Sequence, residues 1–319
     1  MTNKERYIEW VSEQEYIPVM MTPWWLDAVC ADKEWDVLLA EDEDGSIAGA
    51  MPYLLRKRAW FKYIIMPQQT QIGGIWVTAE VTADRWRTAE VCRQIKEQLD
   101  KMGLAYYYQQ YLPGSLCVDA MGGLGFNIHE RITYRVEDLS DLDKLINSFS
   151  KNKRRQLQKA LSLHAERGMD PEDFYRFHTL CMRSRRRKLS YSREFLLVLE
   201  RKARRLGQCE ILSIRNADGQ PYAAAFLVWD KHNMYFLIPT YDPAFHESGA
   251  GALLALEAMK LAREKHVTFD FEGSMERGVA KHYKQFGSTP TKYYAVEKYY
   301  KPIFRLAIWF QKLRECGMR

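Results

Sequence analysis

Two stretches of the chain, 35–55 and 209–229, share one pattern of apolar and polar positions. Each has a β-rich run, an Asp-Gly pair (Asp44-Gly45 or Asp218-Gly219) and a second apolar run that begins with small residues. Asp-Gly between two such runs is a strong signal for a hairpin turn. The pattern therefore predicts one β-hairpin in each half of the chain.

The segments after each hairpin also repeat. A short apolar strand stopped by proline (64–67 and 236–239) precedes a glycine-bearing loop and a helix (83–101 and 252–265). A strand (105–109 and 268–272), a short helix beside Gly125-Phe126 or Phe286-Gly287, and a closing β-run (132–136 and 292–298) follow. This order predicts an α/β fold with two tandem domains, each a central mixed β-sheet flanked by helices. We place the first domain at 1–145 and the second at 146–319.

Composition narrows the class of protein. The 319 residues are 47% hydrophobic and 28% charged, which is ordinary for a folded domain and excludes a disordered chain. No apolar run reaches the length of ~18 residues that a spanning helix needs, and the charged start MTNKERYIEW lacks the apolar core of a signal peptide. We therefore expect a cytoplasmic protein. The six cysteines form no CxxC and no Cys/His cluster, so we expect no metal.

Charge is concentrated in one segment. The chain carries +6 overall, but residues 151–205 contain 17 Lys or Arg and 6 Asp or Glu, a local charge of 17 − 6 = +11. Two dense runs stand out, KNKRRQLQK at 151–159 and RSRRRK at 183–188. They are either solvated helix faces or a binding surface for an anionic, phosphate-bearing partner. We name Arg154 and Arg155 as candidate substrate-binding residues, because guanidinium groups bind phosphate in bidentate fashion.

The chemical signal lies in the second copy. In LIPTYDPAFHESGAGALLALEAMKLAREK, residues 237–265, a strand ends, a loop follows, and Gly-Ala-Gly opens a helix. Backbone N–H groups at a helix start bind anions, and glycine allows a phosphate to come close. The alternative is an ordinary glycine-rich helix start, since the loop lacks the complete dinucleotide and P-loop motifs.

Several motifs together resemble a known family. TPWWL at 22–26, DFEGS at 270–274, VAKHYKQFG at 279–287 and the tandem copies resemble the FemAB-like and BioF2-like branch of the GNAT acyltransferases. This resemblance implies that the loop Glu247, Ser248, Gly249, Ala250, Gly251 and Ala252 binds the pyrophosphate of acetyl-CoA. It also implies that a splayed strand at Leu237-Ile238 holds the thioester and pantetheine. Tyr283 matches the tyrosine that serves as general acid to the leaving thiolate.

Two acids, two aromatic residues and a histidine complete the candidate site. Alternation in the strand FDFEGSM places Asp270 and Glu272 on one face, where they are candidate bases for deprotonating an amine. The alternative is a pair of structural carboxylates. Trp25 and Tyr241 are candidate substrate contacts, with a core role as the alternative for Trp25. His282 is a lesser candidate beside Tyr283.

We interpret the chain as an N-acyltransferase that moves an acyl group from acyl-CoA to an amine-bearing small molecule. One alternative is a FemAB-like transferase that takes its group from aminoacyl-tRNA and acts on a peptidoglycan (cell-wall) precursor. The other is a non-catalytic GNAT-fold binding protein, favoured by the absence of Arg or Lys from Phe245-His246-Glu247. The C-terminal stretch KPIFRLAIWFQKLRECGMR is amphipathic, so it either packs on its own domain or contacts the inner membrane face. Each of these functions is compatible with a monomer or a homodimer.

Overall fold

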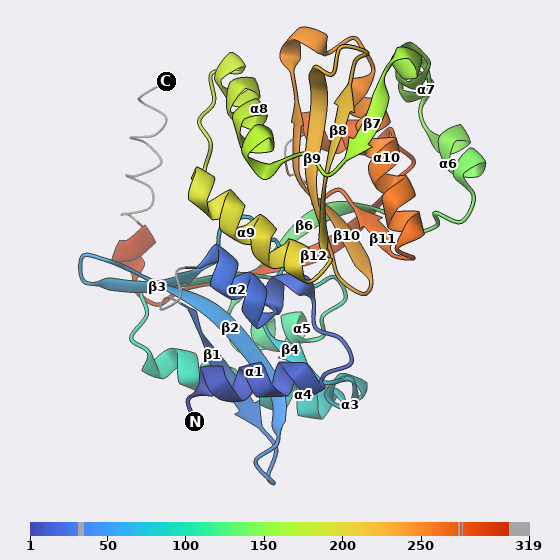
Figure 1. Cartoon of the computed structure of the whole chain (residues 1–319). Coiled ribbons are helices and arrows are strands. Elements are labelled where there is room, and N and C mark those ends of the chain that lie inside the picture. Colours follow the sequence, from blue (N-terminus) through green and yellow to red (C-terminus); the bar gives the residue numbers. More distant parts are fainter. Residues whose placement is uncertain (31–34, 274, 276, 306–319) are drawn as a thin grey trace. The chain divides into compact units, whose positions relative to one another are not determined.

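The computed structural model describes residues 1–30, 35–273, 275 and 277–305 (Figure 1). The chain divides into two compact units. The first contains Met1–Arg131 together with the chain from Lys292 onward, and the second contains Ile132–Thr291. Both units combine helices with a mixed sheet, which confirms the predicted α/β class.

The first unit contains the predicted β-hairpin and helix of the first copy, together with several short elements. Its helices are α1 (Asn3–Glu13), η1 (Val19–Met21), α2 (Pro23–Val29), α3 (Ala79–Ala83), α4 (Arg85–Lys101) and α5 (Cys117–Gly123). Its strands are β1 (Trp35–Glu41), β2 (Ile47–Arg58), β3 (Phe61–Ile65), β4 (Trp76–Val77), β5 (Tyr106–Tyr111) and most of β12 (Thr289–Tyr299).

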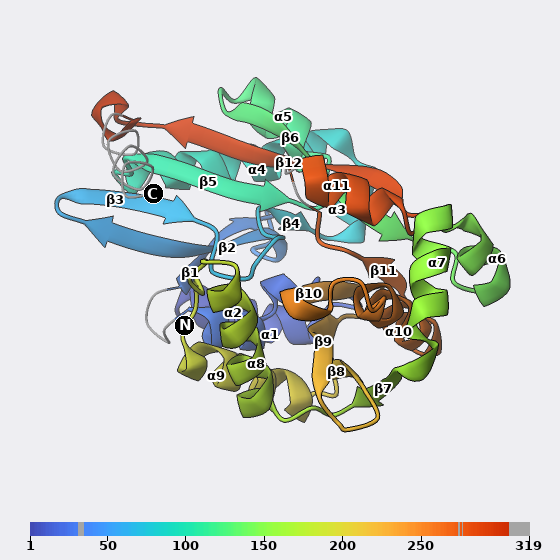
Figure 2. The same ribbon diagram turned by 90° about the horizontal axis from the view of Figure 1, so that it is seen from above.

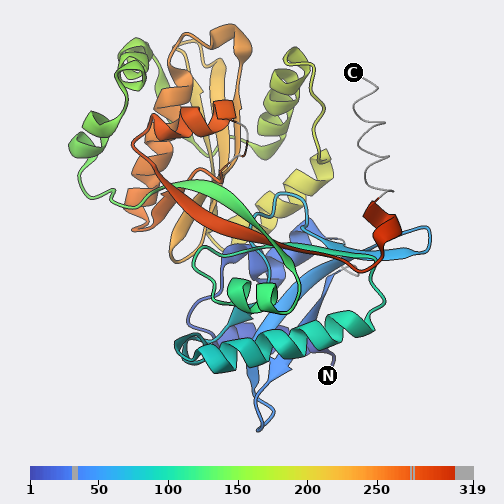
Figure 3. The same cartoon turned by 180° about the vertical axis from the view of Figure 1, so that it is seen from behind.

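The sheet of the first unit has the order β1-β2-β3-β5-β12, with β4 paired to β2. β1 and β2 form the antiparallel hairpin that Asp44-Gly45 predicts, and Gly45 adopts the left-handed φ of +82° that this turn uses. Helices α1 and α2 cover one face of the sheet, while α4 and α5 cover the other (Figures 1 and 3). The fully buried Ile95 and Leu99 of α4 pack in one cluster with Tyr107 and Val296 of the sheet.

The second unit follows the same plan with a longer helical insertion. Its helices are α6 (Leu142–Ser148), α7 (Lys151–Lys159), η2 (Ala160–Ser162), α8 (Pro171–Ser184), α9 (Arg193–Arg205), η3 (Pro243–Phe245), α10 (Ala250–Glu264) and α11 (Arg277–Lys284). Its strands are the end of β6 (Asn127–Val136), β7 (His164–Arg167), β8 (Cys209–Arg215), β9 (Pro221–Trp229), β10 (Asn233–Tyr241) and β11 (Thr268–Asp270).

The sheet of the second unit has the order β6-β11-β10-β9-β8-β7. β8 and β9 form the second predicted hairpin, again with a left-handed glycine, Gly219. The apolar side of α10 lies against β8–β11, and its Leu254, Ala258 and Met259 are fully buried in the core of the unit. Helices α8 and α9 lie on the opposite face (Figure 1). A long buried helix thus starts at the glycine loop at the end of β10.

The closing strands of the two copies do not follow the predicted domains. β12, which ends the second copy in sequence, pairs with β5 of the first unit from Tyr294↔Tyr111 to Tyr299↔Tyr106. The end of β6, which closes the first copy in sequence, pairs with β11 of the second unit. The unit boundaries therefore lie within β6 and β12, and differ from the predicted ranges 1–145 and 146–319.

Among the described residues, no helix combines the length and the apolar character needed to cross a membrane. The amphipathic C-terminal stretch beyond Arg305, with Trp309, lies outside the described residues.

Candidate functional site

β10 and β11 separate at the centre of the second unit. Their parallel pairing runs only from Asn233↔Thr268 to Tyr235↔Asp270, whereas β10 continues to Tyr241. The strand does not stop at Pro239 as predicted, because that residue still pairs with Ala225 of β9. Leu237 and Ile238, the predicted contacts of the thioester arm, are buried and lie directly beyond the point of separation.

The start of α10 requires glycine. Gly249, the N-cap, has a φ of +82°, and a Cβ atom there would lie 1.9 Å from the backbone oxygen of Gln156 in α7. A Cβ atom on Gly251 would lie 3.0 Å from the ring of Tyr241. Ala250 N–H donates to Ser248 Oγ over 3.2 Å. The loop thus brings the helix start close to both α7 and the end of β10.

A cavity of about 440 Å³ opens at this helix start. Its walls come from α7, the end of β10, η3, the first turn of α10 and α11. Figure 2 shows the ribbons of α7, α10 and α11 in the second unit. On one side, the rings of Tyr222 and Phe245 stack in parallel with centroids 3.7 Å apart. Gly249, Ala250, Gly251, Ala252 and Tyr241 all line the cavity, so the structure gathers most of the predicted loop around one hollow.

Lys153 of α7 is a buried cation in the wall of this cavity. Only 3% of the residue is exposed. Its Nζ lies 2.9 Å from Gln156 Oε1, 3.3 Å from His282 Nδ1 and 4.6 Å from the ring centroid of Phe286. Among the described residues no carboxylate forms an ion pair with it. Burial lowers the pKa of Lys153 to about 8. Burial and the charge of Lys153 lower the pKa of His282 to about 4, so that imidazole is neutral at pH 7.

Further positive charge reaches the cavity from two other elements. Arg185, at the end of α8, donates from Nη2 to the backbone oxygen of Tyr241 over 2.7 Å. Lys281 of α11 also lines the cavity. Asp242 is the acidic residue among the lining residues, and its carboxylate already accepts from Ala244 N–H at the start of η3. The charged residues of the lining are therefore mostly cations.

Asp270 is held by structural contacts. The residue is 1% exposed, and its Oδ2 accepts from Arg135 Nε over 2.8 Å. Its Oδ1 accepts from the hydroxyl of Thr133 and from Glu272 N–H. Three donors around one buried carboxylate favour the structural alternative for Asp270 over the role of general base.

Glu272 and Tyr283 lie near each other beyond the end of β11. Glu272 has a φ of +59° and lies two residues beyond the end of β11, so the strand alternation predicted for Asp270 and Glu272 does not extend to it. Burial together with the charge of Asp270 raises the pKa of the Glu272 carboxyl well above its usual range. Tyr283 of α11 stacks on Phe271 with centroids 4.5 Å apart. Burial and the nearby charge of Glu272 raise the pKa of Tyr283 to about 12, so its hydroxyl keeps its proton at neutral pH.

Other predicted residues do not line the cavity. Arg154 and Arg155 lie on the exposed side of α7, one and two positions from Lys153. Glu247 is exposed, and Ser248 caps the helix start instead of facing the hollow. Trp25 is fully buried in the first unit, where its Nε1 donates to Thr70 Oγ1 over 3.0 Å. It is a core residue, which corrects its interpretation as a substrate contact.

Sequence reasoning missed Lys153, Gln156 and Arg185. Nothing local distinguishes Lys153 from the other cations of KNKRRQLQK, because its burial depends on contacts with α11, some 130 residues later. Arg185 was recognised only as part of a basic run. In the described part of the chain, no group of three His, Cys, Asp or Glu residues could hold a metal ion.

Comparison with known proteins gives a family match over part of the chain and similar folds over most of it. Residues 147–285 match the family described as acetyltransferase (GNAT) domain. A crystal structure of FemX has a TM-score of 0.69 at 15% identity, over 92% of this chain and 96% of that chain. No curated protein matches the sequence.

Two further solved structures share the fold. The C-terminal DUF2156 domain of a putative lysylphosphatidylglycerol synthetase from Agrobacterium fabrum has a TM-score of 0.52 at 13% identity, over 82% and 83% of the two chains. A tandem GNAT protein from the clavulanic acid biosynthesis pathway has a TM-score of 0.51 at 12% identity, over 83% and 82%.

The fold and the matched domain define the class. Residues 147–285, within the second unit, match the GNAT acetyltransferase domain model, and the whole-chain fold is similar to that of FemX and of a tandem GNAT protein. This confirms the predicted tandem GNAT fold and agrees with the FemAB-like group. The family that residues 147–285 match is a family of acetyltransferases.

Proposed function

We propose that the protein is an N-acyltransferase that binds a phosphate-bearing acyl donor, acyl-CoA, at the start of α10. The observation that carries this proposal is the cavity in which a glycine-dependent helix start meets a buried lysine without a carboxylate partner among the described residues. A buried charge is costly unless it is compensated. An anionic ligand would supply that compensation.

The lining of the cavity fits a pyrophosphate. The start of the 15-residue helix α10 presents backbone N–H groups with a positive partial charge. Lys153, Arg185 and Lys281 add three cations from three separate elements. The loop 245–247 itself has no Arg or Lys, but the tertiary fold brings these charges from α7, α8 and α11. This supports a donor-binding role over loss of the donor site.

The separation of β10 and β11 would receive the reacting end of the donor. An amine nitrogen attacks the thioester carbonyl, the C–S bond breaks, and the amine loses a proton while the thiolate gains one. Tyr283, protonated at neutral pH, is suited to supply the proton to sulfur. Glu272, with its raised pKa, is the better candidate of the two acids for accepting the proton of the amine.

A second candidate is transfer from aminoacyl-tRNA. It is favoured by exposed cations, Arg154 and Arg155 on α7 and the run at 183–188 that begins in the last turn of α8. They exceed what one pyrophosphate needs. A nucleic acid would contact such a surface through several phosphates, and its binding would weaken steeply with salt.

Calorimetric titration with acetyl-CoA and with desulfo-CoA tests the lead proposal. We expect micromolar binding of both, abolished by Gly251→Trp, whose side chain would enter the cavity beside Tyr241. Leu206→Trp, at a 54% exposed position, is the matched control and should bind as the parent does. Absence of binding at millimolar CoA would contradict the CoA donor. Binding of charged tRNA with a strong salt dependence would then support the second candidate.

A further inference from the structure

We infer that the tip of the β2–β3 hairpin is a docking site for an anionic phospholipid surface. The inference is independent of the proposed acyl transfer. It rests on three features of residues 56–62: concentrated positive charge, an unfavourable pairing of like charges, and a large exposed aromatic side chain.

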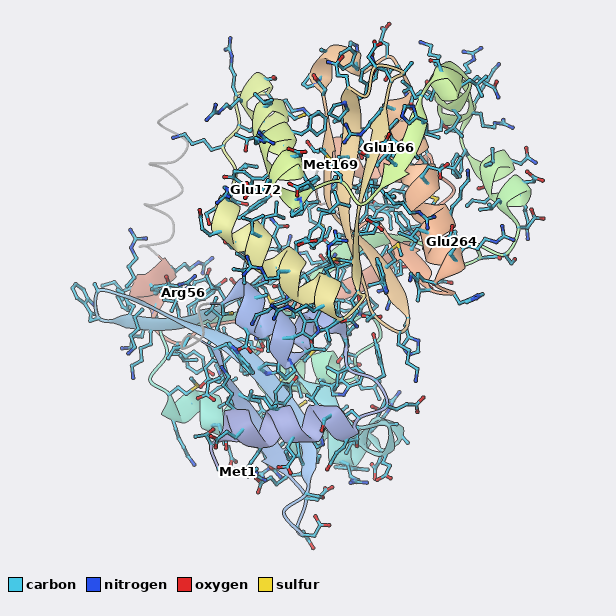
Figure 4. All side chains as sticks on the ribbon, in the orientation of Figure 1. Met1, Arg56, Glu166, Met169, Glu172 and Glu264 are labelled. Atoms are coloured by element: carbon cyan, nitrogen blue, oxygen red, sulfur yellow. The ribbon has the colours of Figure 1, made fainter. Side chains whose placement is uncertain are left out.

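The hairpin concentrates charge of one sign. Residues 46–79 contain no Asp or Glu, and their four Lys or Arg residues, Arg56, Lys57, Arg58 and Lys62, all lie within seven positions. The hairpin extends beyond the neighbouring strands of its own unit, with Arg56 on its outer half (Figure 4). The segment therefore presents a local positive potential.

The strand register makes this charge costly. Lys57 pairs directly with Lys62 across the hairpin, so both side chains project from the same face. Both are exposed, and neither forms an ion pair among the described residues. Like charges directly opposite each other destabilise a strand pair. An external anionic surface would remove this repulsion.

The turn itself displays a tryptophan. Ala59 and Trp60 form the two-residue connection between β2 and β3, and 79% of Trp60 is exposed. The neighbouring Phe61 packs against Phe304 with centroids 5.3 Å apart, which anchors one side of the hairpin to its unit. Trp60 is thus held outward on a supported ribbon rather than on a loose loop.

This combination suits a lipid surface better than a nucleic acid. Tryptophan favours the membrane interface, where its ring lies at the level of the head groups, and flanking Lys and Arg bind anionic lipids. A narrow hairpin tip with one aromatic side chain can enter a flat interface. Single-stranded nucleic acid is usually bound along a groove with several stacking platforms, and the tip offers one exposed ring.

Vesicle co-sedimentation of the full chain tests the inference. The vesicles contain equal parts of phosphatidylglycerol and phosphatidylcholine, with phosphatidylcholine alone as the reference. We expect binding only to the anionic vesicles, weakened by salt. Lys57→Gln with Lys62→Gln should weaken it roughly 30-fold, because each cation near an anionic leaflet contributes about 1 kcal/mol. Trp60→Ala should also weaken binding.

Matched control variants show which residues are responsible for vesicle binding. Trp86→Ala removes an equally exposed tryptophan (87%) of the same unit and should leave vesicle binding unchanged. Lys151→Gln with Arg154→Gln and Arg155→Gln removes cations from the second unit and should have a smaller effect than the hairpin variants. Equal binding of the parent and the Trp60 and lysine variants would overturn the inference. So would binding of an RNA duplex without binding of anionic vesicles.

Discussion

At the scale of single residues, burial gives different properties to residues that look alike in the sequence. Lys151, Lys153, Arg154 and Arg155 share one basic helix, yet only Lys153 is buried and faces the cavity. Asp270 and Glu272 lie two positions apart in the sequence, yet Asp270 accepts three hydrogen bonds while Glu272 has the raised pKa. The chemical role of each residue therefore follows from its neighbours in space.

Replacing Lys153 by Met should stabilise the protein and weaken donor binding. The folded-state pKa of Lys153 is about 8, below its ordinary value of 10.5. Below pH 8 both states carry the proton, and the folded state bears the cost of the buried charge. Between pH 8 and 10.5 the unfolded state holds more protons, so stability rises with pH. Met removes this cost, roughly 1–3 kcal/mol at pH 7.

Thermal unfolding and calorimetry check this prediction. Lys153→Met should melt at a higher temperature than the parent at pH 7, and the gap should narrow toward pH 10. Affinity for desulfo-CoA should fall about 10-fold or more, since hydrogen bonds to charged groups contribute about 1.5–3 kcal/mol. A variant that melts lower at pH 7 and binds desulfo-CoA normally would contradict both parts.

Asp270→Asn should lower the stability of the protein, whereas Tyr283→Phe should lower its activity. Asn removes the charge that the half-buried guanidinium of Arg135 binds, so unfolding free energy should fall by about 1.5–3 kcal/mol. Phe keeps the stacking on Phe271, so Tyr283→Phe should leave stability nearly unchanged and lower kcat roughly 10²–10⁴-fold. Denaturant unfolding and initial rates measure the two effects. A stable but inactive Asp270→Asn would restore Asp270 as the general base.

At the scale of elements, the start of α10 depends on the element packed against it. Gly249 needs a left-handed φ, and its missing side chain leaves room for the end of α7. The sequence pattern predicts the helix and its glycines, because both signals are local. The contact with Gln156 joins positions 93 residues apart (249 − 156) and has no local signature.

A comparison of Gly249→Ala with Gly219→Ala separates the cost of backbone strain from the cost of a steric clash. Both glycines have φ near +80°, but a Cβ atom at Gly219 meets nothing within 4 Å. We expect Gly219→Ala to cost about 1–2 kcal/mol, the penalty of a left-handed residue with a side chain. Gly249→Ala should cost clearly more, because its Cβ atom would overlap the Gln156 carbonyl. Equal losses in urea unfolding would show that α7 moves aside freely.

At the scale of the whole molecule, the first unit is completed by a strand that follows the second unit in sequence, and the second unit includes the end of a strand that the repeat assigns to the first copy. Val296 of β12 is fully buried in the core of the first unit, although it follows the entire second unit in the chain. Tyr134 and Val136 of β6 lie in the core of the second unit. The domain ranges read from the repeat therefore cut through both cores.

The fragment 1–145 should not fold cooperatively. It lacks β12, so β5 loses its partner from Tyr106 to Tyr111 and the core loses Val296. A chain that joins 1–131 to 292–305 through a short glycine-serine linker restores both and should show a cooperative thermal transition with near-ultraviolet dichroism. A cooperative transition in 1–145 alone would show that β12 is dispensable for the first unit.

The local sequence of this protein determines its two hairpins, its main helices and the glycine loop at the start of α10. Asp-Gly turns, apolar periodicity and helix caps act over a few residues, so they can be recognised in a single sequence. The tertiary structure decides which cation is buried, which carboxylate is held by Arg135, and which sheet receives β6 and β12. Those outcomes depend on contacts between positions more than a hundred residues apart, where burial and register are set by the packed fold and not by any neighbour in sequence.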